Sequence, residues 1–408
     1  MGQSGIEVVD DGAGAAARAG LHRRPARLRE IAGIGVDRMG SLADALPERD
    51  FLRLENLDVD IPPDPAAIAR TRLAATTDAD NSYLPFVGQT RLRQVAARHV
   101  ARLSGVDYAG ERNCVIAAGG LSGLLNVLLA TVEVGDEVIV TDPTYAGIIN
   151  RVHLAGGVPR FVPFAFRPGE PWKLDRAALA ATIGPKTRAL LLMSPSMPSG
   201  GVLDAEDWAG GARLCVRHDL LLILDSAMER LLFDGRAVIH PAGLPGMAER
   251  TITVGAASKE LRMIGWRVGW IVAPEAFMPD LVAVSLANVV VPVGIAQDAA
   301  ASALESSAET LPAYVAELER RRDEVLRQLA GLPVGVPAGG WSLLLRAEDF
   351  GLDGAALSRR LFEQGVCATA MQGWGRRHGG QSLRFVFANE PVERLALLGP
   401  RVRRALGL

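Results

Sequence analysis

Between about residues 90 and 275, short runs of apolar, strand-forming residues alternate with segments of helical periodicity. Each run is apolar along nearly its whole length, so both faces of the sheet that it joins must be covered. Alternation of such strands with helices predicts an α/β fold built on a doubly wound, mostly parallel sheet. The predicted strands lie within 114–120, 137–145, 160–164, 188–195, 220–227, 251–258 and 268–274.

The pattern changes at about residue 311. "PAYVAELERRRDEVLRQL" predicts a long amphipathic helix, and the segments after it predict a strand, a helix and a strand, which form a smaller α+β domain. About the first twenty residues are rich in Gly and Ala, which predicts a disordered tail. The predicted divisions are a tail over 1–20, an N-terminal segment over 21–75, a large domain over 76–310 and a small domain over 311–408.

Composition argues against several classes of protein. A net charge of -2 gives no sign of binding to nucleic acid or to an anionic membrane. No segment reaches the ~18 apolar residues of a membrane span, and the N-terminus lacks the apolar core of a secretory signal. The cysteines Cys114, Cys215 and Cys367 are far apart, which argues against disulfides or a metal site. We therefore expect a cytoplasmic protein that binds no metal.

Lysine is rare in this chain. Of 44 lysines and arginines, only three are lysines, namely Lys173, Lys186 and Lys259. Lys259 follows a predicted strand, at a position where this sequence would use arginine if only a charge were needed. A primary amine forms a Schiff base with an aldehyde. Lys259 is therefore a candidate for covalent chemistry.

Other residues of chemical interest follow neighbouring strands, where open α/β sheets bind their ligands. The glycines of "AAGGLSG" (117–123) precede a helix whose free N–H groups suit a phosphate, although a tight turn is the alternative. Tyr145 offers an aromatic face at the sheet edge, with packing in the core as the alternative. Asp225 ends an apolar run; its carboxylate needs a partner if it is buried, and the alternative is a helix cap. Arg267 follows Lys259 by eight residues.

These residue types together meet the needs of one cofactor. The amine suits an aldehyde, the helix N-terminus and the guanidinium suit a phosphate, and the tyrosine suits a planar ring. A carboxylate holds a pyridine nitrogen protonated. The set predicts a binding site for pyridoxal 5'-phosphate.

Residues from about 50 to 405 resemble a fold-type I pyridoxal-phosphate enzyme of the class I/II aminotransferase family. "SKELRMIGWRVGW" matches the family's S-K, five residues, then G-W-R-x-G-W/Y without a gap. The resemblance implies that Lys259 forms the Schiff base and that Tyr145 stacks on the cofactor ring while Asp225 pairs with its nitrogen. The residues implied at or beside the phosphate are Gly120, Leu121, Ser258 and Arg267.

The resemblance reaches beyond the cofactor. "YLPFVGQTRLRQVAARHV" is similar to the family's Y-x4-G-x3-L-R segment, which implies that Tyr83 reaches the phosphate of a partner subunit in a homodimer. "SLRFVFA" matches the strand whose arginine binds the substrate α-carboxylate, which implies that role for Arg384. It also implies a small domain that combines the N-terminal segment with residues after about 310.

Three positions depart from the family pattern. Met197 and Met228 stand where an asparagine and a tyrosine usually donate to the cofactor's phenolic oxygen, and Ala256 replaces a serine near the phosphate. Loss of both donors indicates altered chemistry or an altered substrate pocket, unless another residue or a water takes over the contact. Arg262, three residues after the lysine, is a candidate to recognise a carboxylate, with a solvent-facing arginine as the alternative.

The predicted function is an aminotransferase that acts on an α-amino acid. The alternative with the same cofactor is elimination, replacement or ring closure, as in relatives that resemble aminocyclopropane-carboxylate synthase. A regulatory ligand-binding domain is disfavoured because no helix-turn-helix pattern or basic face precedes the resemblance.

Overall fold

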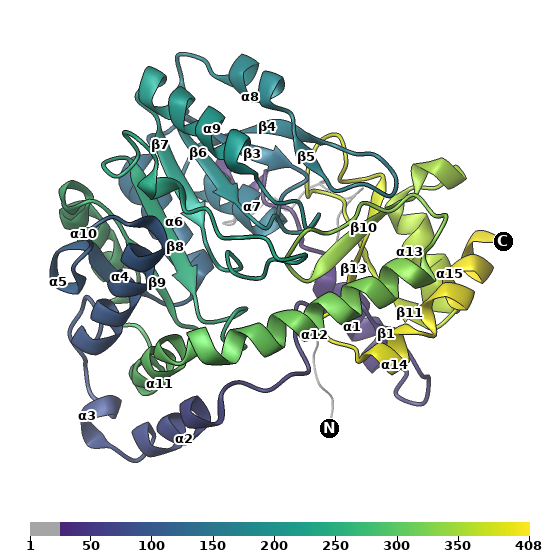
Figure 1. The fold of residues 1–408 in the computed structure, drawn as a ribbon, viewed down its shortest axis with the longest axis horizontal. Helices are drawn as coiled ribbons and strands as arrows, with labels where there is room; N and C mark the ends of the chain where they lie inside the picture. The colour runs from purple at the N-terminus through teal and green to yellow at the C-terminus, as the bar shows by residue number, and fades with distance from the viewer. Residues whose placement is uncertain (1–24) are drawn as a thin grey trace, which may run out of the picture.

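The computed structural model describes residues 25–408, so the predicted tail over 1–20 lies outside the described residues. Eight strands form one large sheet in the order β2-β9-β8-β7-β6-β3-β4-β5 (Figure 1). Its five middle strands from β8 to β4 run parallel, whereas β9 and β5 run antiparallel to their neighbours. The strand bounds are β2 (Cys114–Ala117), β3 (Glu137–Asp142), β4 (Val158–Ala165), β5 (Lys173–Leu174), β6 (Thr187–Met193), β7 (Leu221–Asp225), β8 (Thr251–Ala256) and β9 (Gly269–Val272).

Both faces of this sheet are covered by helices, as the unbroken apolar strands predicted. In β2, Ile116 packs in an apolar cluster with residues of α4 (Thr90–Ser104) and α11 (Gly294–Glu305). Its neighbour Val115 points the other way and packs in the cluster that includes α6 (Gly120–Thr131). Successive residues of a strand face opposite sides of the sheet, so helices lie on both sides. The predicted α/β architecture is confirmed.

A smaller unit follows the long helix α12 (Ser307–Gln328), which crosses the front of the molecule in Figure 1. It contains the antiparallel sheet β10-β13-β12 and the parallel pair β1-β11. Because β1 pairs with β11, the N-terminal segment is part of this unit. We refer to it as the C-terminal unit, and the exact boundaries at 76–310 and 311–408 stay a prediction. Its strands are β1 (Leu52–Arg53), β10 (Ser342–Arg346), β11 (Val366–Cys367), β12 (Thr369–Ala370) and β13 (Ser382–Val386).

The remaining helices connect or cover these sheets. They are α1 (Val36–Asp44), α2 (Pro65–Ala74), α3 (Asp78–Asn81), α5 (Gly110–Asn113), α7 (Ala146–Leu154), α8 (Arg176–Thr182), α9 (Ala205–His218), α10 (Met278–Val289), α13 (Gly354–Glu363), α14 (Val392–Leu395) and α15 (Leu398–Leu406). Within residues 25–408, no helix is long and apolar enough to cross a membrane.

Candidate active site

The carboxyl ends of the parallel strands bring the candidate residues to one edge of the large sheet. Asp225 is the last residue of β7, Lys259 lies three residues beyond β8, and Tyr145 lies three residues beyond β3. Strands β8, β7, β6 and β3 are successive neighbours in the sheet. The charge of Asp225 acts on both Lys259 and Tyr145, which places the three side chains in one electrostatic neighbourhood.

Gly119, Gly120, Gly269 and Arg267 approach one another closely where α6 begins, and we call this arrangement the cradle. Gly119 caps the helix with a φ of 91°, and a Cβ on it would lie 2.5 Å from Nη2 of Arg267. A Cβ on Gly269 would lie 2.7 Å from the backbone N of Gly120. Only glycines therefore fit where β9 and Arg267 approach the helix. The free N–H groups of Gly120 and Leu121 and the guanidinium of Arg267 meet here, which is an arrangement suited to an anion.

Lys259 lies in a partly enclosed position. Its Nζ is 5.7 Å from the ring centroid of Trp341. Burial is the main cause that lowers the pKa of Lys259 to about 8; the carboxylate of Asp225 opposes the shift, and the positive charge of Arg384 adds to it. The other two lysines of the chain, Lys173 and Lys186, are exposed. Lys259 is thus a lysine whose pKa is shifted toward neutral pH.

Asp225 is a buried carboxylate whose hydrogen bonding within residues 25–408 comes from the backbone alone. Its Oδ1 accepts one hydrogen bond, from the backbone N–H of Ala227 at 3.1 Å. Burial raises the pKa of Asp225, while the positive charge of Lys259 lowers it. A buried carboxylate whose pKa is raised by burial is stabilised in its charged form by a cationic partner.

Arg384 lies in the middle of β13 and is fully buried. Its Nη2 donates to the carbonyl oxygen of Glu55 at 2.6 Å and to Oγ1 of Thr369 at 3.0 Å. Its Nε and Nη1 have no hydrogen-bond partner. Burial lowers the pKa of Arg384 to about 10, which leaves it charged at neutral pH. Two unpaired N–H groups on a buried cation are a site for a carboxylate.

Of the three departures from the family pattern, Met228 and Ala256 lie beside this site. Met197 and Met228 are buried, and a Cβ on Gly340, the residue before Trp341, would lie 3.9 Å from Sδ of Met228. Ala256 lies against the cradle, since its Cβ would be 3.0 Å from a Cβ on Gly120. None of these three side chains can donate a hydrogen bond.

Three other candidates lie differently. Ser258 is half-buried and its Oγ accepts from Nη1 of Arg267 at 3.4 Å, so it borders the cradle. Tyr83 is 87% exposed in the loop before α4, and the described chain does not bring it to Lys259. Arg262 donates to the carbonyl of Pro62 at 2.8 Å and lies 4.8 Å from the ring of Tyr314, so it is not a solvent-facing arginine.

Two tryptophans of the C-terminal unit were missed by the sequence analysis. Trp341 lies beside Lys259, and its Nε1 is buried without a partner. Trp374 lies edge-on to Tyr145 with ring centroids 5.1 Å apart, and the guanidinium of Arg384 is 4.8 Å from its ring centroid. The sequence marks both as apolar, but gives no signal that they reach the other unit's residues.

Comparison with known proteins gives a consistent picture. The model of the family "Aminotransferase class I and II" matches residues 52–398. Arginine–pyruvate transaminase of Pseudomonas aeruginosa is 36% identical over 80% of this chain and 84% of its own length. Aromatic-amino-acid aminotransferase 2 of Thermococcus litoralis is 33% identical over 69% of this chain and 73% of its own length. The structure of aspartate aminotransferase from Thermus thermophilus with maleate has a TM-score of 0.83 at 26% identity, over 95% of this chain and 98% of that one.

Proposed function

Because this chain belongs to the class I and II aminotransferase family and is an aminotransferase acting on amino acids, we propose that Lys259 is its catalytic amine. The observation that carries this proposal is the position of Lys259 between a buried acid and a buried arginine, with its pKa lowered to about 8. At pH 7 about a tenth of such amines are neutral, against less than about one part in a thousand for an ordinary lysine. Lys259 is thereby suited to covalent chemistry and to proton transfer.

The family depends on pyridoxal phosphate, and the residues present fit that group. The cradle at α6 suits its phosphate, and the ring of Tyr145 suits its planar ring. The hydrogen bond that Asp225 accepts comes from a backbone N–H, and its carboxylate can accept another from a pyridinium nitrogen. When bound, pyridoxal phosphate supplies a reactive aldehyde and an electron-accepting ring. The residues that would hold it are Gly120, Leu121, Tyr145, Asp225, Ser258, Lys259 and Arg267.

Arg384 is the proposed binding residue for the substrate carboxylate. Its Nε and Nη1 carry unpaired N–H groups, which can donate to the oxygens of a carboxylate. Thr369 and the carbonyl of Glu55 hold Nη2 in place. Arg384 therefore orients the amino acid, while Lys259 holds or moves a proton at the amino-bearing carbon.

A homodimer with shared sites is the proposed assembly. Tyr83 and Phe86 are exposed next to α11, since a Cβ on Gly294 would lie 2.3 Å from the carbonyl oxygen of Asp80. Val290 and Val293, in the segment just before that helix, are 46% and 43% exposed. An exposed apolar area of this kind is typical of a protein–protein interface. A second copy would cover it and bring Tyr83 to the neighbouring site.

We also propose a cytoplasmic location, supported by three cysteines that are buried and free of disulfides.

Mass spectrometry of the bound cofactor tests amino-group transfer directly. The purified protein, loaded with pyridoxal phosphate, is incubated with a panel of single amino acids. Transfer of the amino group converts the cofactor to pyridoxamine phosphate. Consumption of an amino acid with unchanged pyridoxal phosphate would instead indicate elimination, replacement or ring closure.

A further inference from the structure

Asp142, the last residue of β3, binds a loop of the C-terminal unit. Its buried carboxylate accepts three successive backbone N–H groups, from Arg376 at 2.9 Å, Arg377 at 2.7 Å and His378 at 3.3 Å. A Cβ on Gly375 would lie 2.2 Å from Oδ1 of Asp142, so the loop approaches too closely for any side chain there. Successive N–H groups around a carboxylate form a concave anion site. We call this arrangement the Asp142 clamp.

The clamped loop carries Trp374 into the candidate active site. The backbone N–H of Thr144 donates to the carbonyl of Trp374 at 2.9 Å, one residue before Tyr145. The Trp374 indole then contacts the ring of Tyr145 and lies against the guanidinium of Arg384. A flat indole face fixes the plane of a guanidinium that lies against it. The position of the loop therefore affects the orientation of Arg384.

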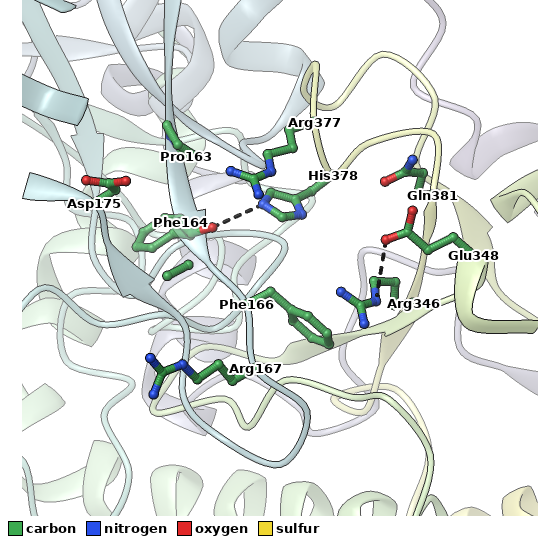
Figure 2. Close-up of a pocket in the computed structure, with 11 residues that line it drawn as sticks. Pro163, Phe164, Phe166, Arg167, Asp175, Arg346, Glu348, Arg377, His378 and Gln381 are labelled. Carbon is green, nitrogen blue, oxygen red and sulfur yellow. Dashed lines mark hydrogen bonds and ion pairs between the residues drawn. The ribbon is translucent and has the colours of Figure 1, made fainter. Parts of the chain in front are cut away.

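Behind the clamp lies a cavity of about 230 Å³, lined by both units. Figure 2 shows His378 at its wall, where Nε2 lies 3.0 Å from the carbonyl oxygen of Phe164 in β4. Arg377 is exposed beside it. Because a cavity borders the loop on this side, hydrogen bonds contribute to its position beside the ring contacts of Arg376 with Phe161 and of His378 with Trp172. The Asp142 clamp supplies three of these hydrogen bonds.

We propose that Asp142 is a positioning residue for recognition of the substrate carboxylate. By clamping the 374–378 loop, it holds Trp374 against Arg384, and so keeps the unpaired N–H groups of the guanidinium directed at the substrate. This inference rests on the proposed role of Arg384 in binding that carboxylate. Asp142 itself does not contact the substrate.

The variant Asp142→Asn tests the proposal, because an amide has the same shape but opposes a donor to at least one loop N–H group. In the full-length, cofactor-loaded protein, hydrogen exchange at the amides of 376–378 should become faster. The dissociation constant of 3-phenylpropanoate, a carboxylate that lacks an amino group, should rise by about tenfold or more. Affinity for pyridoxal phosphate should stay unchanged, which a merely structural role would not predict.

Asp175→Asn is the matched control, since Asp175 lines the same cavity but caps α8 by accepting from Ala178 at 2.9 Å. Asparagine caps helices equally well, so neither measurement should change. Gly375→Ala is the second variant, and should displace the loop and weaken 3-phenylpropanoate binding even if Asp142→Asn fails to fold.

The outcomes separate this inference from the proposed function. Unchanged exchange, or faster exchange with unchanged 3-phenylpropanoate binding, would overturn the role of Asp142. A wild-type protein that binds no carboxylate would instead overturn the role of Arg384, and with it this inference.

Discussion

Glu260, the residue after Lys259, accepts two hydrogen bonds from Arg230, one from the side chain at 2.7 Å and one from the backbone at 2.8 Å. Both side chains are less than 10% exposed. Arg230 follows Met228 by two residues, so this buried ion pair ties the segment that bears Lys259 to the segment that bears Asp225.

Arg230→Ala should destabilise the protein by about 3 kcal/mol or more, because Glu260 would keep a buried charge without its partner. Urea unfolding of the wild type and the variant gives the free energy of unfolding. Arg250→Ala is the control, since Arg250 pairs at 2.8 Å with the exposed Asp219, and a pair of this kind contributes less than about 1 kcal/mol. Equal effects of the two substitutions would show that burial of the Arg230–Glu260 pair is unimportant.

Arg384→Ala should raise the KM for amino acids by about a hundredfold, because loss of one partner of a desolvated ion pair costs several kcal/mol. Affinity for pyridoxal phosphate should change little, since Arg384 is placed at the substrate carboxylate. Steady-state kinetics and cofactor titration measure the two quantities. Arg98→Ala, at an exposed arginine of α4, should change neither. A parallel fall in both affinities in Arg384→Ala would indicate a structural role.

Met228→Tyr should lower the pH at which the lysine-bound cofactor changes its visible absorption. A tyrosine hydroxyl that reaches the phenolic oxygen stabilises the deprotonated state, by about one to two pKa units for a hydrogen bond to a charged group. In the wild type, with Met197 and Met228 in place, this change should occur well above neutral pH. The measurement is a spectrophotometric titration without substrate, with Met228→Leu as the control. A wild-type transition already complete at pH 7 would show that another donor serves this oxygen.

Mixed dimers of Tyr83→Phe and Lys259→Ala should recover activity, because one of the two sites would combine an intact Tyr83 with an intact Lys259. Neither parent should approach the activity of the mixture. Subunit exchange is verified by native mass spectrometry of differently tagged chains. If exchange occurs and activity stays at the parental level, Tyr83 does not serve a neighbouring subunit.

The residues that sequence analysis brought together are those that follow strands of the large sheet. Parallel strands end at one edge, so the order of apolar runs was enough to group Tyr145, Asp225 and Lys259. The contacts made by Trp341, Trp374 and Asp142 were not foreseen. They arise where the C-terminal unit folds back on the large sheet, over separations of more than a hundred residues for Asp142, and periodicity shows which residues are buried without showing their partners.

Lys259 is the amine that we expect to attach to the cofactor. Borohydride reduction of the protein loaded with pyridoxal phosphate, followed by proteolysis and mass spectrometry, locates the attached lysine. We expect the pyridoxyl group on the peptide that contains Lys259, and no stable label in Lys259→Ala. A label on Lys173 or Lys186 in the wild type, with Lys259 unmodified, would contradict the account.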